Sequence, residues 1–226
     1  MSSDNTLLVE IWSDISCPWC YIGKARFGTA LEAFPHREAV QVVHRSFELD
    51  PRLQVTRRTT DAEYAAKYGL TPSGALAAEE NLAAIARDEG LQYLVEHRDH
   101  GNTFDLHRLL HLAESYGLHD DLLDSFYRAN FASERSIFDR EYQAELAVAA
   151  GLDPAEVRHV LDDVTAYAPQ VRADEEEAAR LGITGVPFFV IDRKYGLSGA
   201  QPAEAFTEAL GRAWADHDTP AGTPAS

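Results

Sequence analysis

The chain has 226 residues and carries 20 lysines and arginines against 37 aspartates and glutamates, a formal net charge of −17 at pH 7. Hydrophobic residues make up 45% of it, which is typical of a soluble globular protein and excludes a chain that is disordered throughout. We expect no nucleic-acid or membrane partner, because the acidic charge repels both and no apolar run approaches the roughly 20 residues of a membrane helix. The first residues, Met1–Asn5, lack the basic and apolar regions of a signal peptide, so we expect a cytoplasmic protein.

The chain opens with a pattern typical of a strand–helix–strand unit. Residues 7–12 form an apolar run that predicts a buried strand, and residues 40–47 predict a second one. Between them we expect a helix with Cys17 at its cap and Pro18 at its first position, where a missing N–H costs nothing. This unit predicts two parallel strands joined by a right-handed crossover.

The middle of the chain, residues 61–180, is rich in Ala, Leu and Glu and predicts five or six helices without a strand. Strand patterns return at 187–191 and 195–198 as a hairpin, and a last helix follows. We therefore expect an α/β fold, βαβ and then ββα, with a large all-helical insertion. The predicted division is one discontinuous domain over 1–55 and 170–216, a helical insertion domain over 56–169, and a disordered tail over 217–226.

The two cysteines of the chain, Cys17 and Cys20, stand three residues apart at the start of a predicted helix. Unpaired N–H groups and the helix dipole stabilise a thiolate there, so we expect the pKa of Cys17 to be lowered. The exposed, low-pKa Cys17 would attack a substrate disulfide, and Cys20 would resolve the mixed disulfide. Pro18 would stiffen the turn, and Trp19 would offer an apolar surface beside the sulfurs.

Other interpretations of the two cysteines remain. A structural zinc site would need two histidines, because the chain has no further cysteine. Covalent haem attachment requires histidine after the second cysteine, where this chain has Tyr21. The two cysteines could also be an inert buried pair, which the helix-start position disfavours.

Three further patterns have a structural interpretation as the simpler one. Pro187 reads as a trans proline that begins a strand. The acidic run 174–177 reads as a solvated helix face. His107 and His111 have the four-residue spacing of a metal pair, but no third ligand is evident, so packed or edge histidines are the simpler interpretation.

Taken together, these motifs resemble the DsbA-like thioredoxin-fold oxidoreductases, and more closely their FrnE-like cytosolic subgroup. Cys17-Pro18-Trp19-Cys20 and Gly185-Val186-Pro187 carry most of this resemblance. The matching segments are Asp14–Lys24, Phe47–Pro51, Asn102–Thr103, His107–Leu109, Gly182–Pro187 and Ser198–Gln201.

The resemblance implies a thioredoxin-like fold and a cis Pro187 that faces the cysteines, with the backbone of Val186 pairing with an extended substrate. Pro18 and Trp19 would complete the substrate-binding rim. Periplasmic relatives carry Pro-His between the cysteines, so Pro-Trp favours an isomerase-like rather than a strongly oxidising enzyme. The negative charge of Asp14 would oppose the thiolate if its carboxylate lies close.

We therefore expect a cytosolic dithiol–disulfide oxidoreductase or isomerase with Cys17 and Cys20 as catalytic residues and with no metal. The redox-active disulfide would replace an organic cofactor, with glutathione as a possible co-substrate. Partners would be thiol- or disulfide-containing proteins or small thiols. The alternatives are a glutathione-dependent isomerase of small aromatic compounds, similar to 2-hydroxychromene-2-carboxylate isomerase, and a chaperone-like binding protein. The aromatic isomerases usually keep a single nucleophile, often Ser, which the retained cysteine pair argues against.

Overall fold

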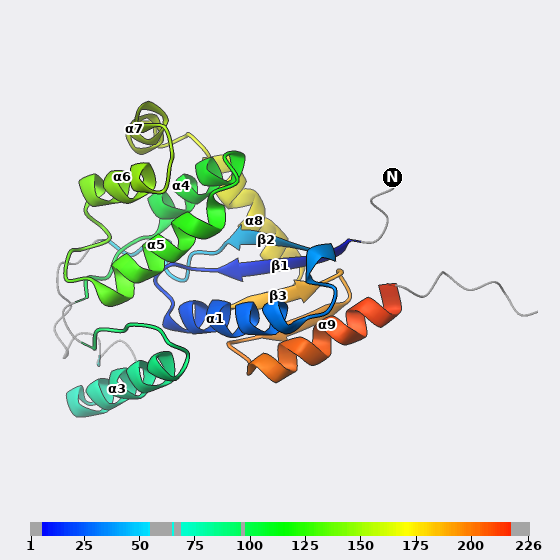
Figure 1. Cartoon of the computed structure of the whole chain (residues 1–226). Helices are drawn as coiled ribbons and strands as arrows, with labels where there is room; N and C mark the ends of the chain where they lie inside the picture. Colours follow the sequence, from blue (N-terminus) through cyan, green and yellow to red (C-terminus); the bar gives the residue numbers. More distant parts are fainter. Residues whose placement is uncertain (1–5, 55–64, 66–68, 96–97, 218–226) are drawn as a thin grey trace, which may run out of the picture.

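The computed structural model describes residues 6–54, 65, 69–95 and 98–217 of the chain (Figure 1). All but the first residue of the predicted tail, 217–226, lies outside the described residues. The elements are, in chain order, β1 (Leu7–Ser13), α1 (Pro18–Ala33), the short 3-10 helix η1 (Arg37–Ala39), β2 (Val40–Ser46), α3 (Pro72–Asp88), α4 (Phe104–Ser115), α5 (His119–Ala132), α6 (Arg140–Ala149), α7 (Pro154–Asp162), α8 (Ala168–Arg180), β3 (Phe188–Ile191), β4 (Tyr195–Ser198) and α9 (Ala203–His217).

The four strands form one sheet in the order β2-β1-β3-β4. The predicted parallel pairing is confirmed, with Val9 of β1 opposite Val42 of β2. β3 runs antiparallel to β1 on its other side and forms the predicted hairpin with β4. β1 pairs with a strand on each side and its residues are almost all buried. β2 lies at an edge of the sheet and its residues are mostly half-buried.

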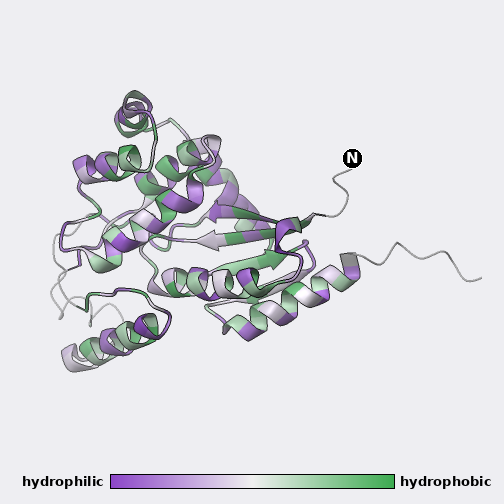
Figure 2. Ribbon diagram, in the orientation of Figure 1, coloured by the Kyte–Doolittle hydropathy of each residue, from purple (hydrophilic) through white to green (hydrophobic). Residues whose placement is uncertain are grey.

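Helices cover both faces of this sheet. On one face, α1 and α9 pack against alternate residues of β1, and Phe27, Phe189 and Phe206 meet in the core between them. On the other face, Trp12 contacts Ala178 of α8. Figure 2 shows β3 as a continuously hydrophobic ribbon, consistent with burial on both faces.

The helices α4, α5, α6 and α7 pack on one another beside the sheet, while α3 lies apart and contacts α1 (Figure 1). The buried side chains of α4, α5, α6 and α7 form one large core cluster, and this cluster also contains Cys17 and Cys20. α8 packs against both β2 and α4, so the helical part and the sheet share an extensive boundary. The domain limits of the sequence analysis stay a prediction.

Six helices lie between β2 and β3 in the described part of the chain, in agreement with the predicted five or six. Aspartate or threonine caps start several of them: Asp153 accepts hydrogen bonds from two backbone amides at the start of α7, and Asp139 does so for α6. No helix among the described residues is long and apolar enough to cross a membrane.

Candidate active site

The two cysteines lie at the turn from β1 into α1. β1 ends at Ser13, and Cys17 is the N-cap of α1 with an extended backbone (φ −88°, ψ 113°), followed by Pro18 in the first turn. Proline suits this position because the first helical N–H groups have no partner within the helix. Both cysteines are free thiols, and they lie 3.4 Å apart. The predicted helix start is confirmed.

The loop before β3 faces these thiols. The Val186–Pro187 peptide bond is cis, as the family resemblance implied, so the interpretation of Pro187 as a trans strand-starting proline is wrong. The Cys17 thiol donates a hydrogen bond to the carbonyl oxygen of Val186, with 3.5 Å between sulfur and oxygen. The structure thus brings Val186 and Pro187 beside Cys17 from a position 169 residues further along the chain.

α1 approaches this loop closely at Gly23. A Cβ atom at position 23 would lie 3.1 Å from Cγ of Pro187 and 3.4 Å from the backbone of Ala200. The absence of a side chain at Gly23 therefore allows the helix and the loop to meet beside Cys17.

Cys17 is less exposed than the sequence analysis expected. Its exposed fraction is 4%, against 2% for Cys20, because the Val186 carbonyl and the helical core cover it. Trp19, between the two cysteines, is 40% exposed, and Pro18 is half-buried. Leu49, whose amide hydrogen-bonds to Asp14, is 48% exposed. An apolar rim therefore lies beside a largely covered sulfur.

Asp14 joins the active-site turn to two other parts of the fold. Its buried carboxylate accepts hydrogen bonds from the amide and hydroxyl of Ser16 and from the amide of Leu49. Nε2 of His107, on α4, lies 3.6 Å from Oδ1 of Asp14. Burial raises the pKa of Asp14, but His107, the Leu49 amide and Thr103 outweigh it, so the pKa lies below its ordinary value and the group is ionised.

The environment disfavours a thiolate on Cys20. Burial raises the pKa of Cys20 well above its ordinary value, and the hydrogen bond and charge of Cys17 raise it further. The charge of Asp14 acts in the same direction, whereas a hydrogen bond with the Asp14 backbone opposes it. We expected the charge of Asp14 to oppose a thiolate if its carboxylate lies close, and the structure shows this charge acting on Cys20.

α5 supplies side chains to this turn that the sequence analysis missed. Nδ2 of Asn130 donates a hydrogen bond to the carbonyl oxygen of Ile15, at 2.9 Å. The rings of Tyr127 and Phe131 lie 5.4 Å from the ring of Tyr21, the residue after Cys20. Their i, i+3, i+4 spacing is a sequence signal for a buried face, but nothing in it shows which segment that face meets.

The two histidines of α4 are packed and do not form a metal pair. His107 lies against Asp14, whereas Nε2 of His111 lies 3.1 Å from both the Ser46 hydroxyl and the Asp174 carboxylate. Across the described ranges, no group of three or more histidine, cysteine or acidic side chains could hold a metal ion.

The interpretation of the acidic run 174–177 as a solvated helix face is wrong for Asp174. This carboxylate is buried between α8 and β2, where it pairs with Arg45 and accepts a hydrogen bond from the Ser46 amide. A basic partner on β2 makes burial of the charge tolerable, and that pairing is not visible in the run itself.

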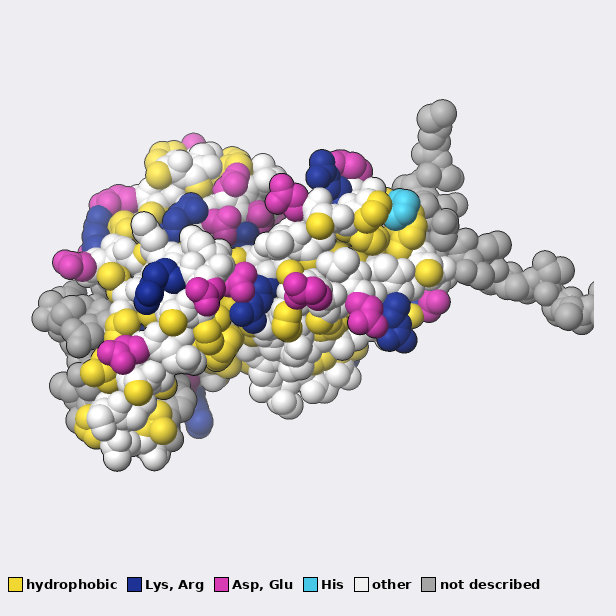
Figure 3. Space-filling model, turned by 60° about the horizontal axis from the view of Figure 1, so that its bottom comes forward, with side chains coloured by type: hydrophobic (Ala, Val, Ile, Leu, Met, Phe, Trp, Pro, Cys, Tyr) yellow, Lys and Arg dark blue, Asp and Glu magenta, His cyan; other side chains and the backbone are white. Residues whose placement is uncertain are grey.

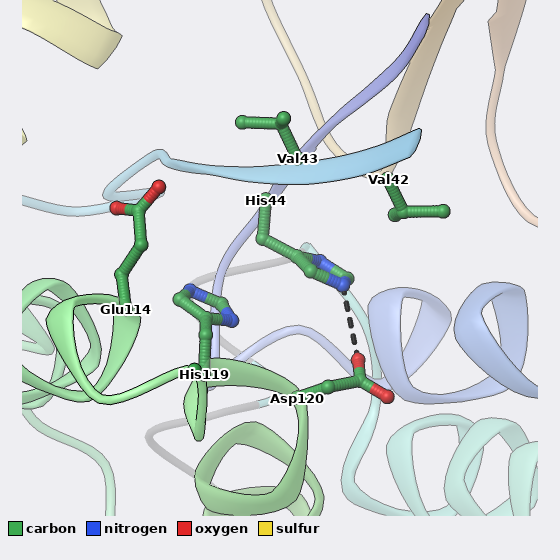
Figure 4. A pocket seen from close by; sticks show the side chains of 7 residues that line it. Val42, Val43, His44, Glu114, His119 and Asp120 are labelled. Atoms are coloured by element: carbon green, nitrogen blue, oxygen red, sulfur yellow. Dashed lines mark hydrogen bonds and ion pairs between the residues drawn. The ribbon is translucent and has the colours of Figure 1, made fainter. Parts of the chain in front are cut away.

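A hollow of about 220 Å³ lies away from the cysteines, between β2 and the start of α5. Figure 4 shows His44 reaching from β2 toward His119 and Asp120. The two imidazole rings stack with 4.9 Å between centroids, and Nε2 of His44 lies 3.1 Å from Asp120. No residue of the cysteine turn lines this hollow. We place the candidate active site at Cys17 and Cys20 because the two free thiols and the cis-proline loop meet there.

A strand that leads into a helix-capping Cys-x-x-Cys, faced by a cis-proline loop, defines a protein with the dithiol site of the thioredoxin fold. The sequence profile of the DSBA-like thioredoxin domain matches residues 8–211, so the chain belongs to this family. The comparisons do not separate the FrnE-like subgroup, which stays a prediction.

Known structures agree with this assignment. A probable DsbA oxidoreductase from Streptomyces coelicolor is 61% identical, with a TM-score of 0.89 over 97% of this chain and 93% of its own. A putative protein disulfide isomerase from Nitrosomonas europaea is 15% identical, with a TM-score of 0.71 over 95% of this chain and 100% of its own. A 2-hydroxychromene-2-carboxylate isomerase is 14% identical, with a TM-score of 0.69 over 91% of this chain and 95% of its own. The last two show a shared fold and no more.

Proposed function

We propose that this protein is a dithiol–disulfide oxidoreductase or isomerase that works through Cys17 and Cys20. The observation that carries the proposal is the pair of free thiols 3.4 Å apart at the start of α1, with the Cys17 thiol on the Val186 carbonyl. An inert structural pair needs no such loop and no exposed apolar rim. The family and the 61% identical probable DsbA oxidoreductase support the same chemistry.

The exchange runs in two balanced steps. The Cys17 thiolate attacks a substrate disulfide, which forms a Cys17–substrate disulfide and releases one substrate thiolate. The Cys20 sulfur, as thiolate, then attacks Cys17, which releases the second substrate thiolate and leaves a Cys17–Cys20 disulfide. The substrate is reduced by two electrons and the enzyme is oxidised by two. The reverse sequence oxidises a substrate dithiol, and release after the first step allows disulfide isomerisation.

The substrate would lie along the loop that covers Cys17. The Val186 backbone offers hydrogen-bonding groups to an extended segment, and Pro187, Pro18 and Trp19 bound it with apolar surface. We propose thiol- or disulfide-containing proteins or small thiols as partners, with glutathione as a co-substrate and no organic cofactor. We place the reaction in the cytoplasm, and Trp19 in place of histidine favours an isomerase-like potential over a strongly oxidising one.

The first test is the redox equilibrium of the cysteines in glutathione buffers, read by thiol alkylation and mass. We expect a reversible two-electron transition between about −270 and −120 mV, the span from thioredoxin to DsbA. A pair that never forms a disulfide would overturn the proposal and direct attention to the glutathione-dependent aromatic isomerase reaction.

Single substitutions separate the roles of the two cysteines. With dithiobis-nitrobenzoate, a symmetric aromatic disulfide, we expect the reduced protein to release two thionitrobenzoate equivalents. Cys17→Ser should release almost none at the wild-type rate, because the nucleophile is gone. Cys20→Ser should release one equivalent and retain the other as a mixed disulfide, visible by mass. Two-equivalent release by either variant would contradict the mechanism.

A further inference from the structure

The phenol of Tyr127 is a buried polar group that the exchange mechanism above leaves unused. The side chain is fully buried in the core cluster that contains both cysteines. Its hydroxyl has no hydrogen-bond partner within the described part of the chain. An unpaired buried hydroxyl is destabilising, so its presence in an otherwise apolar core calls for an explanation.

Tyr127 lies on the face of α5 that packs against the cysteine turn. Asn130, one helical turn further along α5, is anchored to the Ile15 carbonyl two residues before Cys17. The Tyr127 ring also lies 5.4 Å from the ring of Tyr21, which follows Cys20 directly. The same face of α5 therefore touches the turn on both sides of the cysteines.

The electrostatics agree with this placement. Burial raises the pKa of Tyr127 well above its ordinary value, and a charge on Cys20 raises it further, ahead of smaller effects from Cys17 and Asp14. The Ser13 side chain acts in the opposite direction. The phenol is therefore a neutral O–H donor, and negative charge on either sulfur or on Asp14 bears on it.

We propose that Tyr127 donates a hydrogen bond to the Cys20 sulfur whenever that sulfur carries negative charge, an inference that rests on the proposed dithiol function. Cys20 is charged when it attacks the mixed disulfide and when it leaves from the enzyme disulfide. The phenol keeps its proton in both directions. When Cys20 attacks, the proton it gives up goes to the departing substrate thiolate or to water, and the S–S bond to the substrate breaks as the Cys17–Cys20 bond forms.

Cys20 needs such a donor because its surroundings otherwise penalise the thiolate. The sulfur is buried, and the charge of the ionised Asp14 carboxylate acts against a thiolate on it. The Ser13 side chain bears on this hydroxyl but makes no hydrogen bond to it at ordinary distance, so the hydroxyl can turn toward the sulfur as charge develops there. In the reduced dithiol, a protonated Cys20 presents no negative charge to this hydroxyl.

The test separates the two chemical steps in time. When the reduced protein is mixed with excess dithiobis-nitrobenzoate, the first thionitrobenzoate leaves at a rate proportional to reagent concentration and reports attack by Cys17. The second leaves at a concentration-independent rate and reports attack by Cys20. For Tyr127→Phe we expect an unchanged first rate and a second rate lower by about tenfold, the loss of one charge-assisted hydrogen bond.

Tyr21→Phe is the matched control. It removes a hydroxyl from the same aromatic stack, but the charges that bear on Tyr21 are Arg128 and Asp124 and not the cysteines. We expect both rates to stay at the wild-type values. Thermal melting checks that each variant is folded, which the retained phenyl ring favours.

A purely structural role for Tyr127 gives a different result. The pH midpoint of the second rate reports the Cys20 thiolate, and we expect it to move upward in Tyr127→Phe. A second rate within twofold of wild type, with an unmoved midpoint, would overturn the Tyr127 proposal and leave the dithiol function intact. A wild-type protein that releases no second equivalent would instead overturn the dithiol function itself.

Discussion

At the scale of single residues, Asp14 places a negative charge inside the protein beside two thiols. Its lowered pKa means that stability gained from ionised Asp14 is present above its ordinary value of 3.8 and is lost as the pH falls below it. The same charge makes the Cys20 thiolate less favourable. Asp14 therefore affects both the stability of the protein and the reactivity of Cys20.

Asp14→Asn should separate these two effects. We expect a loss of about 1–3 kcal/mol in the free energy of unfolding, because the amide cannot satisfy Ser16, Leu49 and His107 together. We also expect the second thionitrobenzoate to leave faster at neutral pH, since a charge that opposes the Cys20 thiolate is gone. Urea unfolding and the two-step release measure the two effects.

Asp139→Asn is the control for Asp14→Asn. Asp139 also accepts backbone hydrogen bonds, at the start of α6, but it lies outside the cysteine turn. Asp139→Asn should lose part of the stability that the α6 cap contributes and leave both thionitrobenzoate release rates unchanged. A folded Asp14→Asn protein that resolves more slowly than wild type would contradict the assigned effect of the carboxylate.

At the scale of elements, the contact between α1 and the loop before β3 depends on the absence of a side chain at Gly23. Gly23→Ala would place a methyl group 3.1 Å from Pro187 Cγ and push the loop away from Cys17. We expect a loss of about 1 kcal/mol or more in unfolding free energy from overpacking. We also expect a change in the first release rate, since the Val186 carbonyl moves relative to the Cys17 thiol.

Gly28→Ala on the same helix isolates this packing effect. Among the described residues, no atom beyond the neighbouring residues and backbone of α1 itself would lie within 4 Å of a Cβ at position 28. Alanine favours a helix over glycine by about 1 kcal/mol, so this variant should gain stability and keep both rates. Equal unfolding free energies for the two alanine variants would show that the Pro187 contact carries no cost.

Much of the element order could be predicted, because each element has its own local signal. The apolar run of β1, Pro18 at the start of α1 and the hairpin after Pro187 all follow from short patterns. The contacts of α5 with the cysteine turn could not, because Tyr127 and Asn130 are more than 100 residues from it in sequence. The burial of Asp174 was missed for the same reason, since its partner Arg45 lies on β2.

At the scale of the whole molecule, the net charge of −17 does not form a single acidic surface on the face seen in Figure 3, where acidic and basic side chains alternate. Some of the acidic side chains are buried in ion pairs, which add no net charge. Glu10 is buried in β1 and pairs with Arg45 and Arg193, and Glu48 is buried beside Arg172. The composition predicted the total charge, while its distribution depends on the fold.

The histidines of the hollow in Figure 4 make the stability of the whole fold depend on pH. Burial lowers the pKa of His119 well below its ordinary value of 6.5, and the charges of His44 and His111 lower it further, against Asp120. Below about pH 6.5, His119 therefore binds a proton in the unfolded chain but stays neutral in the folded protein. The free energy of unfolding should therefore fall as the pH drops below about 6.5, by up to about 1.4 kcal/mol per pH unit for this group.

His119→Phe should flatten this part of the pH profile, because phenylalanine keeps the ring beside His44 and cannot titrate. Urea unfolding at pH values from 5 to 8, in steps of about half a pH unit, measures the unfolding free energy of His119→Phe and wild type. His159→Asn, at an exposed position on α7, is the control and should leave the wild-type profile in place. A His119→Phe profile parallel to wild type would contradict the burial of a neutral imidazole.

The order of the chain has a consequence for its synthesis. Cys17 and Cys20 leave the ribosome about 170 residues before Val186 and Pro187, a delay of roughly 10–30 s at ~5–20 residues per second. During that time β1 can pair with β2 but lacks β3, and the thiols lack the carbonyl that covers Cys17. The nascent protein therefore presents its two cysteines uncovered to other thiols and oxidants, and the finished site exists only after release of the C-terminal hairpin.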